Sequence, residues 1–165
     1  MMKGQAERLM PLLGEVMAEA GADWAELAAI GVGTGPGSFT GARVSVAAAR
    51  GLALGLGIPA IGVSLLEAGA FDVARPCRVV IERRGGEVAW QDFGPSGPLT
   101  EPQITQLDDL PPGPPQGASR LAPAVAIAHI AASRLGRPGP RPAPLYLRPA
   151  DAAPARDRGP AIIAQ

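Results

Sequence analysis

The sequence predicts an α/β fold, and two observations lead to that prediction. Segments whose apolar residues recur at three- and four-residue steps alternate with short apolar runs, as helices and strands do in α/β proteins. The 165 residues are 47% hydrophobic, which is enough to build the core of one domain. Fourteen of the 19 prolines lie in residues 94–118 and 136–160, so residues 1–93 keep an ordinary globular pattern.

An amphipathic helix is predicted over Gln5–Ala20. Its apolar positions recur at helical spacing and are Leu9, Leu12, Leu13, Val16, Met17 and Ala20. Pro11 lies inside this pattern, so the regular helix begins near it or its first turn is kinked. Gly21 is a natural stop, and Asp23 is expected to cap a short turn after it.

A strand, a turn and a second helix are predicted next. Residues 27–32 form a short apolar strand, and a glycine-rich turn leads to a helix over Phe39–Leu56 with Ser38 as its N-cap. The helix carries two rows of small residues at four-residue spacing: Gly41, Ser45 and Ala49 in one, and Ala47, Gly51 and Gly55 in the other. Such rows let another backbone approach closely, on a sheet or on a partner helix.

A further strand, a short helix and a hairpin complete the predicted core. Residues 58–63 read as a strand, and Ser64 with Glu67 forms a capping box that opens a helix to about residue 74. Alternating residues 78–81 and 88–93 flank a turn with two adjacent glycines, which is a β-hairpin signal.

The rest of the chain is predicted to be less regular. Residues 94–119 read as loop, including a polar stretch that the pattern leaves unassigned, and residues 121–135 read as a helix. We therefore divide the chain into a core at 1–93, a Pro/Gly-rich loop at 94–120, a C-terminal helix and extended segment at 121–152, and a flexible tail at 153–165.

The turn GVGTGPGSFTGARV (residues 31–44) is the most distinctive motif. It fails the dinucleotide fingerprint, because the third glycine would fall on Ser38 or Thr40, and it lacks the lysine of a P-loop. Two interpretations remain. The turn either joins a strand to a helix capped by Ser38, or accepts an anion through its backbone N–H groups.

Catalytic and metal patterns are weak throughout. No serine has the flanking glycines of a nucleophile elbow, and Asp108 and Asp109 are neighbours that point apart in an extended loop. A pair of Cys77 and His129 stays open, although a lone strand cysteine is usually an inert small hydrophobe. One histidine and one cysteine do not make a zinc site, so we expect no catalytic residue and no metal site.

Charge and hydropathy narrow the function classes. Fifteen basic and 15 acidic residues cancel, which argues against a dedicated electrostatic DNA binder. No apolar run approaches membrane-spanning length, so we expect a soluble cytoplasmic protein with no membrane contact. The apolar faces of the two long helices fit core packing and a partner interface equally well.

Several stretches resemble the TsaB family, formerly called YeaZ. The family signature is matched by Gly35, Pro36, Gly37, Ser38, Phe39, Thr40 and Gly41, followed by Arg43. Stretches that agree in the same order are QAERLMPLL, IPAIGVSLLEA, ERRGGEVAWQDF and PLYLRPADA. The resemblance implies an actin-like ATPase / RNase H-like fold.

The resemblance also implies a function in tRNA modification. TsaB proteins are regarded as non-catalytic paralogues of TsaD that pair with it and are joined by the ATPase TsaE. The assembly transfers threonylcarbamoyl to the adenosine beside the anticodon of tRNA. It implies that ATP and threonylcarbamoyl-adenylate belong to the complex, with no cofactor bound by this chain alone and tRNA met only through the complex.

The family's first two helices make much of the contact with TsaD and of a possible homodimer. On this chain those surfaces correspond to Leu9, Leu12, Leu13, Val16 and Met17 in the first helix, and to Ala42, Ser45, Val46, Ala49 and Gly51 in the second. The signature turn is then expected to aim and pack the second helix.

The chain departs from the family pattern in three places. The strands carrying I-L-A-I-D-T-S with which the family opens have no counterpart, so we expect an N-terminally truncated fold with an exposed sheet edge. Glu82 replaces a family Asp, and Ala89 replaces a family Tyr. The alternatives are a glycoprotease-type peptidase and an independent nucleotide-binding ATPase; the absent metal motif and nucleophile elbow disfavour the first, and the absent lysine the second.

Overall fold

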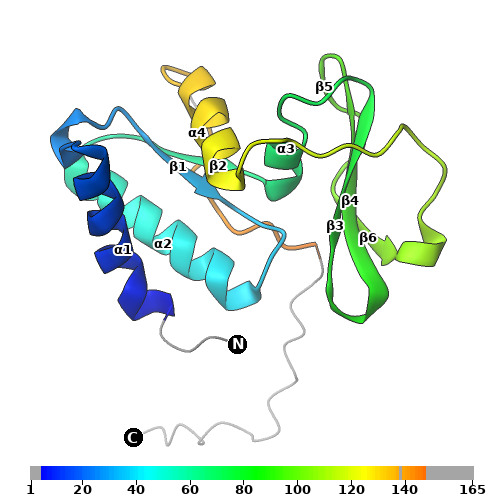
Figure 1. Cartoon of the computed structure of the whole chain (residues 1–165), viewed down its shortest axis with the longest axis horizontal. Helices are drawn as coiled ribbons and strands as arrows, with labels where there is room; N and C mark the ends of the chain where they lie inside the picture. Colours follow the sequence, from blue (N-terminus) through cyan, green and yellow to red (C-terminus); the bar gives the residue numbers. More distant parts are fainter. Residues whose placement is uncertain (1–4, 138, 148–165) are drawn as a thin grey trace, which may run out of the picture.

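The structure is a computed structural model that describes residues 5–137 and 139–147. Two small sheets organise it (Figure 1). A parallel pair contains β1 (Ile30–Gly33) and β2 (Ala60–Val63), and an antiparallel sheet contains β3 (Cys77–Glu82), β4 (Glu87–Gly94), β5 (Gly97–Pro98) and β6 (Gln103–Gln106). The predicted α/β class is confirmed.

The parallel pair is built as a βαβ unit. The helix α2 (Phe39–Leu56) connects β1 to β2, whose register runs from Ile30 opposite Ala60 to Gly33 opposite Val63. Both predicted ends of α2 are confirmed: the Ser38 hydroxyl accepts from the Gly41 N–H at 3.0 Å, and Gly57 stops the helix in the left-handed conformation.

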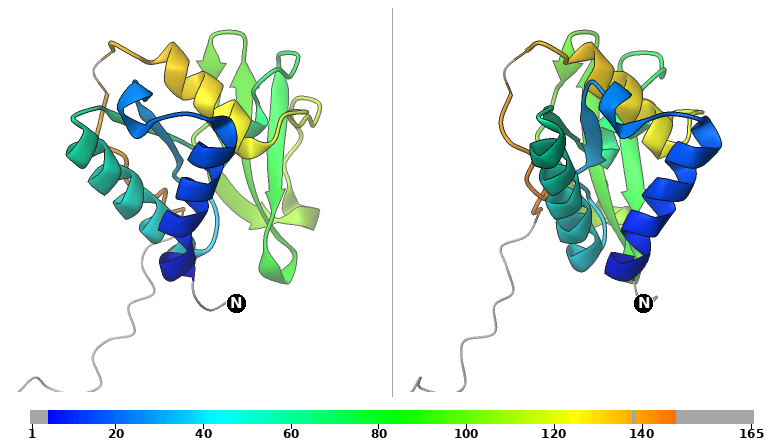
Figure 2. Two further views of the ribbon diagram at one scale, coloured as in Figure 1. Left: turned by 60° about the vertical axis from the view of Figure 1, so that its left-hand side comes forward. Right: turned by 90° about the vertical axis from the view of Figure 1, so that its left-hand side faces the viewer.

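Helices cover both faces of this pair (Figure 2). On one face, Val32 packs against Val46 and Ala49 of α2. On the other, α4 (Pro123–Ser133) packs its buried Ala126, Ile127 and Ile130 with Val63 of β2 and Ala68. The glycines of β1 allow this contact, because a Cβ on Gly31 would lie 3.0 Å from the Ala131 Cβ.

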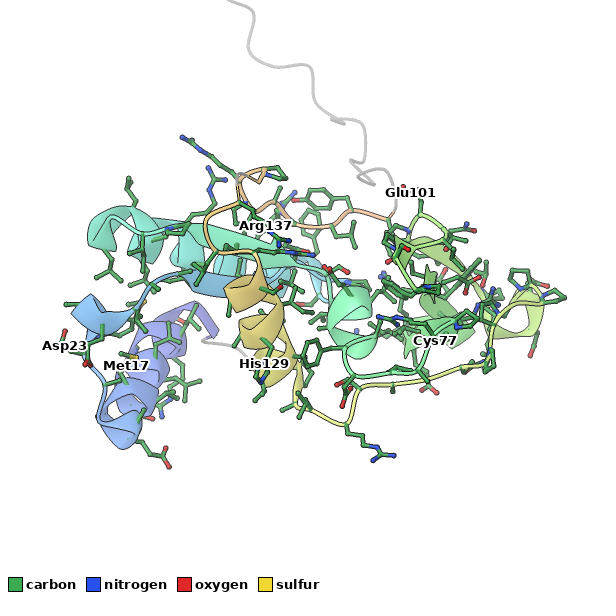
Figure 3. All side chains as sticks on the ribbon, turned by 90° about the horizontal axis from the view of Figure 1, so that it is seen from above. Met17, Asp23, Cys77, Glu101, His129 and Arg137 are labelled. Atoms are coloured by element: carbon green, nitrogen blue, oxygen red, sulfur yellow. The ribbon has the colours of Figure 1, made fainter. Side chains whose placement is uncertain are left out.

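The first helix, α1 (Gln5–Ala20), has the predicted bounds, and Pro11 lies inside it. It lies on the α4 side of the sheet, opposite α2 (Figures 2 and 3). No side chain of α1 from residue 7 to residue 20 is buried. The predicted turn after it is a short 3₁₀ helix, Trp24–Glu26, with a capping box from Asp23. Among the described residues, no helix is both long and apolar enough to cross a membrane.

Four predicted elements are shorter in the structure. The two parallel strands begin at Ile30 and Ala60, and α4 ends at Ser133. The helix α3 (Leu65–Gly69) ends well before residue 74. Its Ser64 cap accepts from the Glu67 N–H as predicted, but the Glu67 carboxylate pairs with Arg134 of the distant α4 end.

The antiparallel sheet confirms the predicted hairpin and corrects the predicted loop. The strands β3 and β4 pair from Cys77 opposite Phe93 to Glu82 opposite Val88. The prediction that residues 94–119 form a loop is wrong. The strands β5 and β6 both pair with β4, and the 3₁₀ helix Leu107–Asp109 follows β6. The sequence does not reveal β6 because its cause is non-local: Gln103–Gln106 forms a strand only because it pairs with the edge of β4. The tail at 153–165 lies outside the described residues.

Candidate functional site

The start of the signature turn is tied to the end of β2 and to the start of α3. The Thr34 N–H donates to the Val63 carbonyl at 2.9 Å, and the Gly35 carbonyl accepts from the Leu65 N–H at 2.6 Å. Gly35 has a φ of 108°, which a side chain rarely tolerates, and Thr34, Gly35 and Pro36 are all buried. The turn therefore joins the ends of β1 and β2 and sets the direction in which α2 leaves.

The exposed half of the turn packs against the C-terminal segment. The Arg43 guanidinium carbon lies 3.5 Å from the centre of the Phe39 ring, and Arg43 Nε donates to the Tyr146 hydroxyl at 2.8 Å. The Phe39 and Tyr146 rings are 5.9 Å apart and tilted by 48°. Nearby, the Leu145 N–H donates to the Thr34 carbonyl at 2.8 Å. This contact supports the structural interpretation of the turn.

The residues considered for catalysis are not assembled. The Ser38 hydroxyl serves as the helix cap. Cys77 is buried next to the Arg75 guanidinium, whereas His129 stacks on Phe71, and the two lie well apart (Figure 3). Asp108 and Asp109 are exposed. The described residues hold no group of three or more His, Cys, Asp or Glu side chains that could bind a metal.

The predicted interface residues of α1 form an open apolar stripe. Leu12 and Val16 are 45% and 51% exposed, and Leu9, Leu13 and Met17 are half-buried. Met10 is not among the predicted interface residues, but it is 45% exposed on the same helix. An amphipathic helix ordinarily buries its apolar stripe, and this one does so only in part.

The predicted interface residues of α2 divide between two faces. Val46 and Ala49 are buried against β1, so we correct their assignment from the partner surface to the core. Ala42 and Ser45 are half-buried at the border, and Gly51 is exposed with open space around its Cα. The row Gly41, Ser45 and Ala49 therefore turns inward, and the row Ala47, Gly51 and Gly55 faces out beside Leu54, which is 84% exposed.

A buried ion pair lies on the second sheet. Arg78 on β3 faces Asp92 on β4, with Nε–Oδ1 at 2.5 Å and Nη2–Oδ2 at 2.7 Å. The hydrogen bonds that Arg78 donates to the Asp92 carboxylate raise the pKa of the Arg78 guanidinium. Arg78 also lies over the Trp90 ring at 4.3 Å and donates to the Pro111 carbonyl, so it fixes the proline-rich loop on this face. The sequence predicts the hairpin but not its register, and the register seen in the structure is what places Arg78 opposite Asp92.

Comparison with known proteins shows where this architecture belongs. Residues 2–92, more than half of the chain, match the family model described as TsaD, tRNA N6-adenosine threonylcarbamoyltransferase. An uncharacterized protein of Mycobacterium tuberculosis is 32% identical over 166 residues, which cover 92% of this chain and 79% of that protein. The tRNA threonylcarbamoyladenosine biosynthesis protein TsaB of Escherichia coli is 38% identical over 92 residues, 53% of this chain and 40% of that protein. The chain belongs to the TsaB/YeaZ family.

Solved structures agree with this family. A crystal structure of a Pseudomonas aeruginosa protein, described as similar to peptidase YEAZ, has a TM-score of 0.66 at 25% identity. The matched region covers 87% of this chain and 84% of the Pseudomonas aeruginosa chain. The predicted fold, of the actin-like ATPase / RNase H-like type found in the TsaD/YeaZ family, is thereby confirmed.

Proposed function

We propose that the chain is a non-catalytic subunit of the complex that forms threonylcarbamoyladenosine in tRNA, and that it pairs there with a TsaD-type protein. The names of its relatives support this. Its TsaB relatives are named for threonylcarbamoyladenosine biosynthesis, and a 69-residue stretch is 41% identical to a tRNA N6-adenosine threonylcarbamoyltransferase of Erythrobacter litoralis. A shared ancestry with TsaD is consistent with pairing between paralogues.

The open apolar stripe of α1 is the observation that carries the proposal. Leu9, Leu12, Leu13, Val16 and Met17 line one side of a helix that buries none of its described side chains. A 16-residue helix is only marginally stable in water without tertiary packing, so this stripe needs a covering surface. A TsaD-type subunit is the occupant that the family membership suggests.

The exposed face of α2 is the second part of the proposed partner surface. A helix face of Ala47, Gly51 and Gly55 lets a partner backbone come close, and the exposed Leu54 beside it supplies apolar area. With Val46 and Ala49 reassigned to the core, Ala42, Ser45 and Gly51 remain as the proposed α2 contacts. The same surfaces are the proposed site of a homodimer when TsaD is absent.

The other roles in the complex follow from this assignment. A TsaE-type ATPase joins the pair, and ATP and threonylcarbamoyl-adenylate are handled by the complex in the cytoplasm, with no cofactor on this chain alone. The tRNA binds to the assembled complex and not to this chain alone. Titration of the isolated chain with a fluorescent ATP analogue tests this division, since saturable binding would favour an independent nucleotide-binding protein.

Co-expression with the TsaD-type protein of the same organism is the direct experiment. Affinity purification through the TsaD-type protein and mass determination of the eluted peak should give a stoichiometric complex. The isolated chain, measured at the same concentration, reports any homodimer. A TsaD-type protein that elutes alone, while both proteins are folded, would contradict the proposal. Cleavage of casein by the isolated chain, abolished by a chelator, would favour a peptidase instead.

A further inference from the structure

We propose that the signature turn and the adjoining end of β2 form a docking site for an extended proline- and tyrosine-containing peptide. In this chain, residues 141–147 occupy the site as an internal ligand. The site belongs to the isolated chain, so its test needs no partner subunit.

The segment Arg-Pro-Ala-Pro-Leu-Tyr-Leu is held at three separate points. Pro142 is buried, and it lies so close to β2 that a Cβ on Gly62 would be 3.3 Å from the Pro142 Cβ. The Leu145 N–H donates to the Thr34 carbonyl at 2.8 Å. Tyr146 meets Arg43 and Phe39 at the first turn of α2.

These three points use the physical rules of peptide recognition. The packed Pro142 side chain and the backbone hydrogen bond of Leu145 fix the path of the extended segment. The contact of the Tyr146 side chain gives specificity. Prolines at 142 and 144 restrict the free segment to extended conformations, which lowers the entropy lost on docking.

Arg43 is the residue that makes the site selective for tyrosine. Its guanidinium stacks on Phe39 and donates to the Tyr146 hydroxyl at 2.8 Å, so the hydrogen bond is added to an already placed cation. Phe39 and Tyr146 are 54% and 52% exposed, which is unusual in a chain with only six Phe, Trp and Tyr residues. The two rings contact each other and Arg43, and this contact explains why they lie together on the surface.

Hydrogen exchange of the full-length chain tests the docking. The Leu145 amide should exchange about tenfold faster in Arg43→Ala, because a cation–π contact and a hydrogen bond are lost together. Arg50→Ala is the matched control on the same helix and should exchange like the unmodified chain. The Thr34 amide, which donates to Val63, reports whether the variant stays folded.

A second variant guards against a fold defect. Tyr146→Phe keeps the ring and removes only the hydroxyl, so Leu145 should exchange about threefold faster. The docking inference is overturned if Leu145 exchanges at the unmodified rate in both Arg43→Ala and Tyr146→Phe while Thr34 stays protected.

Binding in trans tests whether the site is a receptor for the peptide. A labelled peptide of residues 140–147 should bind full-length Tyr146→Ala at least tenfold more tightly than the unmodified chain, whose own segment competes at about millimolar effective concentration. Adding Arg43→Ala to Tyr146→Ala should abolish that binding. Equal binding by all three proteins, or none to Tyr146→Ala at about 1 mM peptide, would overturn the receptor assignment.

Discussion

At the residue scale, one buried guanidinium organises a large part of the second sheet. Arg78 is 3% exposed and meets a carboxylate, an aromatic ring and a loop carbonyl at once. The loop comes close as well, since a Cβ on Gly113 would overlap the Arg78 guanidinium. Arg78 thus replaces the apolar packing that the proline-rich loop cannot supply.

Removing the partner of this guanidinium should destabilise the protein strongly. Asp92→Ala leaves a buried, unpaired charge, so we expect the free energy of unfolding to fall by about 3–5 kcal/mol in urea titrations. The exposed pair of Arg8 and Glu15 is the control. Arg8→Ala should change the free energy of unfolding by less than about 0.5 kcal/mol. An Asp92→Ala effect as small as that of Arg8→Ala would contradict the account of Arg78.

The raised pKa of Arg78 sets how this contribution depends on pH. A pKa that is higher in the folded chain than in the unfolded one stabilises the fold at every pH below the unfolded value. The contribution is lost only as the pH rises through the folded value, far above neutrality. The contribution of the Arg78–Asp92 pair to the free energy of unfolding should therefore not change between about pH 6 and about pH 9 as a result of Arg78 titration.

At the element scale, α2 combines a packed face and an open face. Val46, Ala49 and Ala53 are buried, whereas Gly51 and Gly55 have no atom within 4 Å of an added Cβ. Gly51 lies inside the helix and Gly55 in its last turn, both on the exposed face. A glycine inside a helix costs stability, which is consistent with a face kept flat for a partner.

Filling one of these positions should stabilise the isolated chain. Gly51→Ala removes a helix-interior glycine in open space, so we expect a gain of about 0.5–1 kcal/mol in thermal or urea unfolding. Gly57→Ala should have the opposite sign, because Gly57 has a φ of 69°. A loss of stability in Gly51→Ala would show that its surroundings are not open.

Local signals explain which elements the sequence predicts. Ser38, Ser64 and Gly57 act on neighbouring backbone groups, and so both ends of α2 and the start of α3 are readable from the chain. The strand β6 depends on the distant edge of β4, and the short α3 depends on what packs around it. Neither depends on a local pattern.

The candidate site follows the same division. The turn and its cap were predicted, but the contact of Arg43 with Tyr146 joins residues 103 positions apart, and no local spacing encodes it. The sequence also showed two rows of small residues on α2 without showing which row faces the core. Only the position of β1 beneath α2 decides that Val46 and Ala49 face inward.

At the scale of the whole molecule, two sheets are joined through α3 and α4. Arg134 at the end of α4 donates to the Gly62 carbonyl of β2 at 3.1 Å and pairs with Glu67 of α3. The buried residues of α3 face both sides, since Ala68 packs toward α4 and Leu66 toward β3 and β4. This body presents α1 at one end, away from the second sheet (Figure 1). The proposed partner surface on α1 therefore lies away from the second sheet (Figure 1).

The most direct measurement is the affinity of the TsaD-type protein for two matched variants. Val16 on α1 and Val125 on α4 are valines with 51% and 44% exposure, so Val16→Asp and Val125→Asp place the same charge on two helices. We predict that Val16→Asp weakens binding by about tenfold or more, whereas Val125→Asp binds like the unmodified chain. Unchanged affinity in a folded Val16→Asp variant would contradict the assignment of α1 as the partner surface.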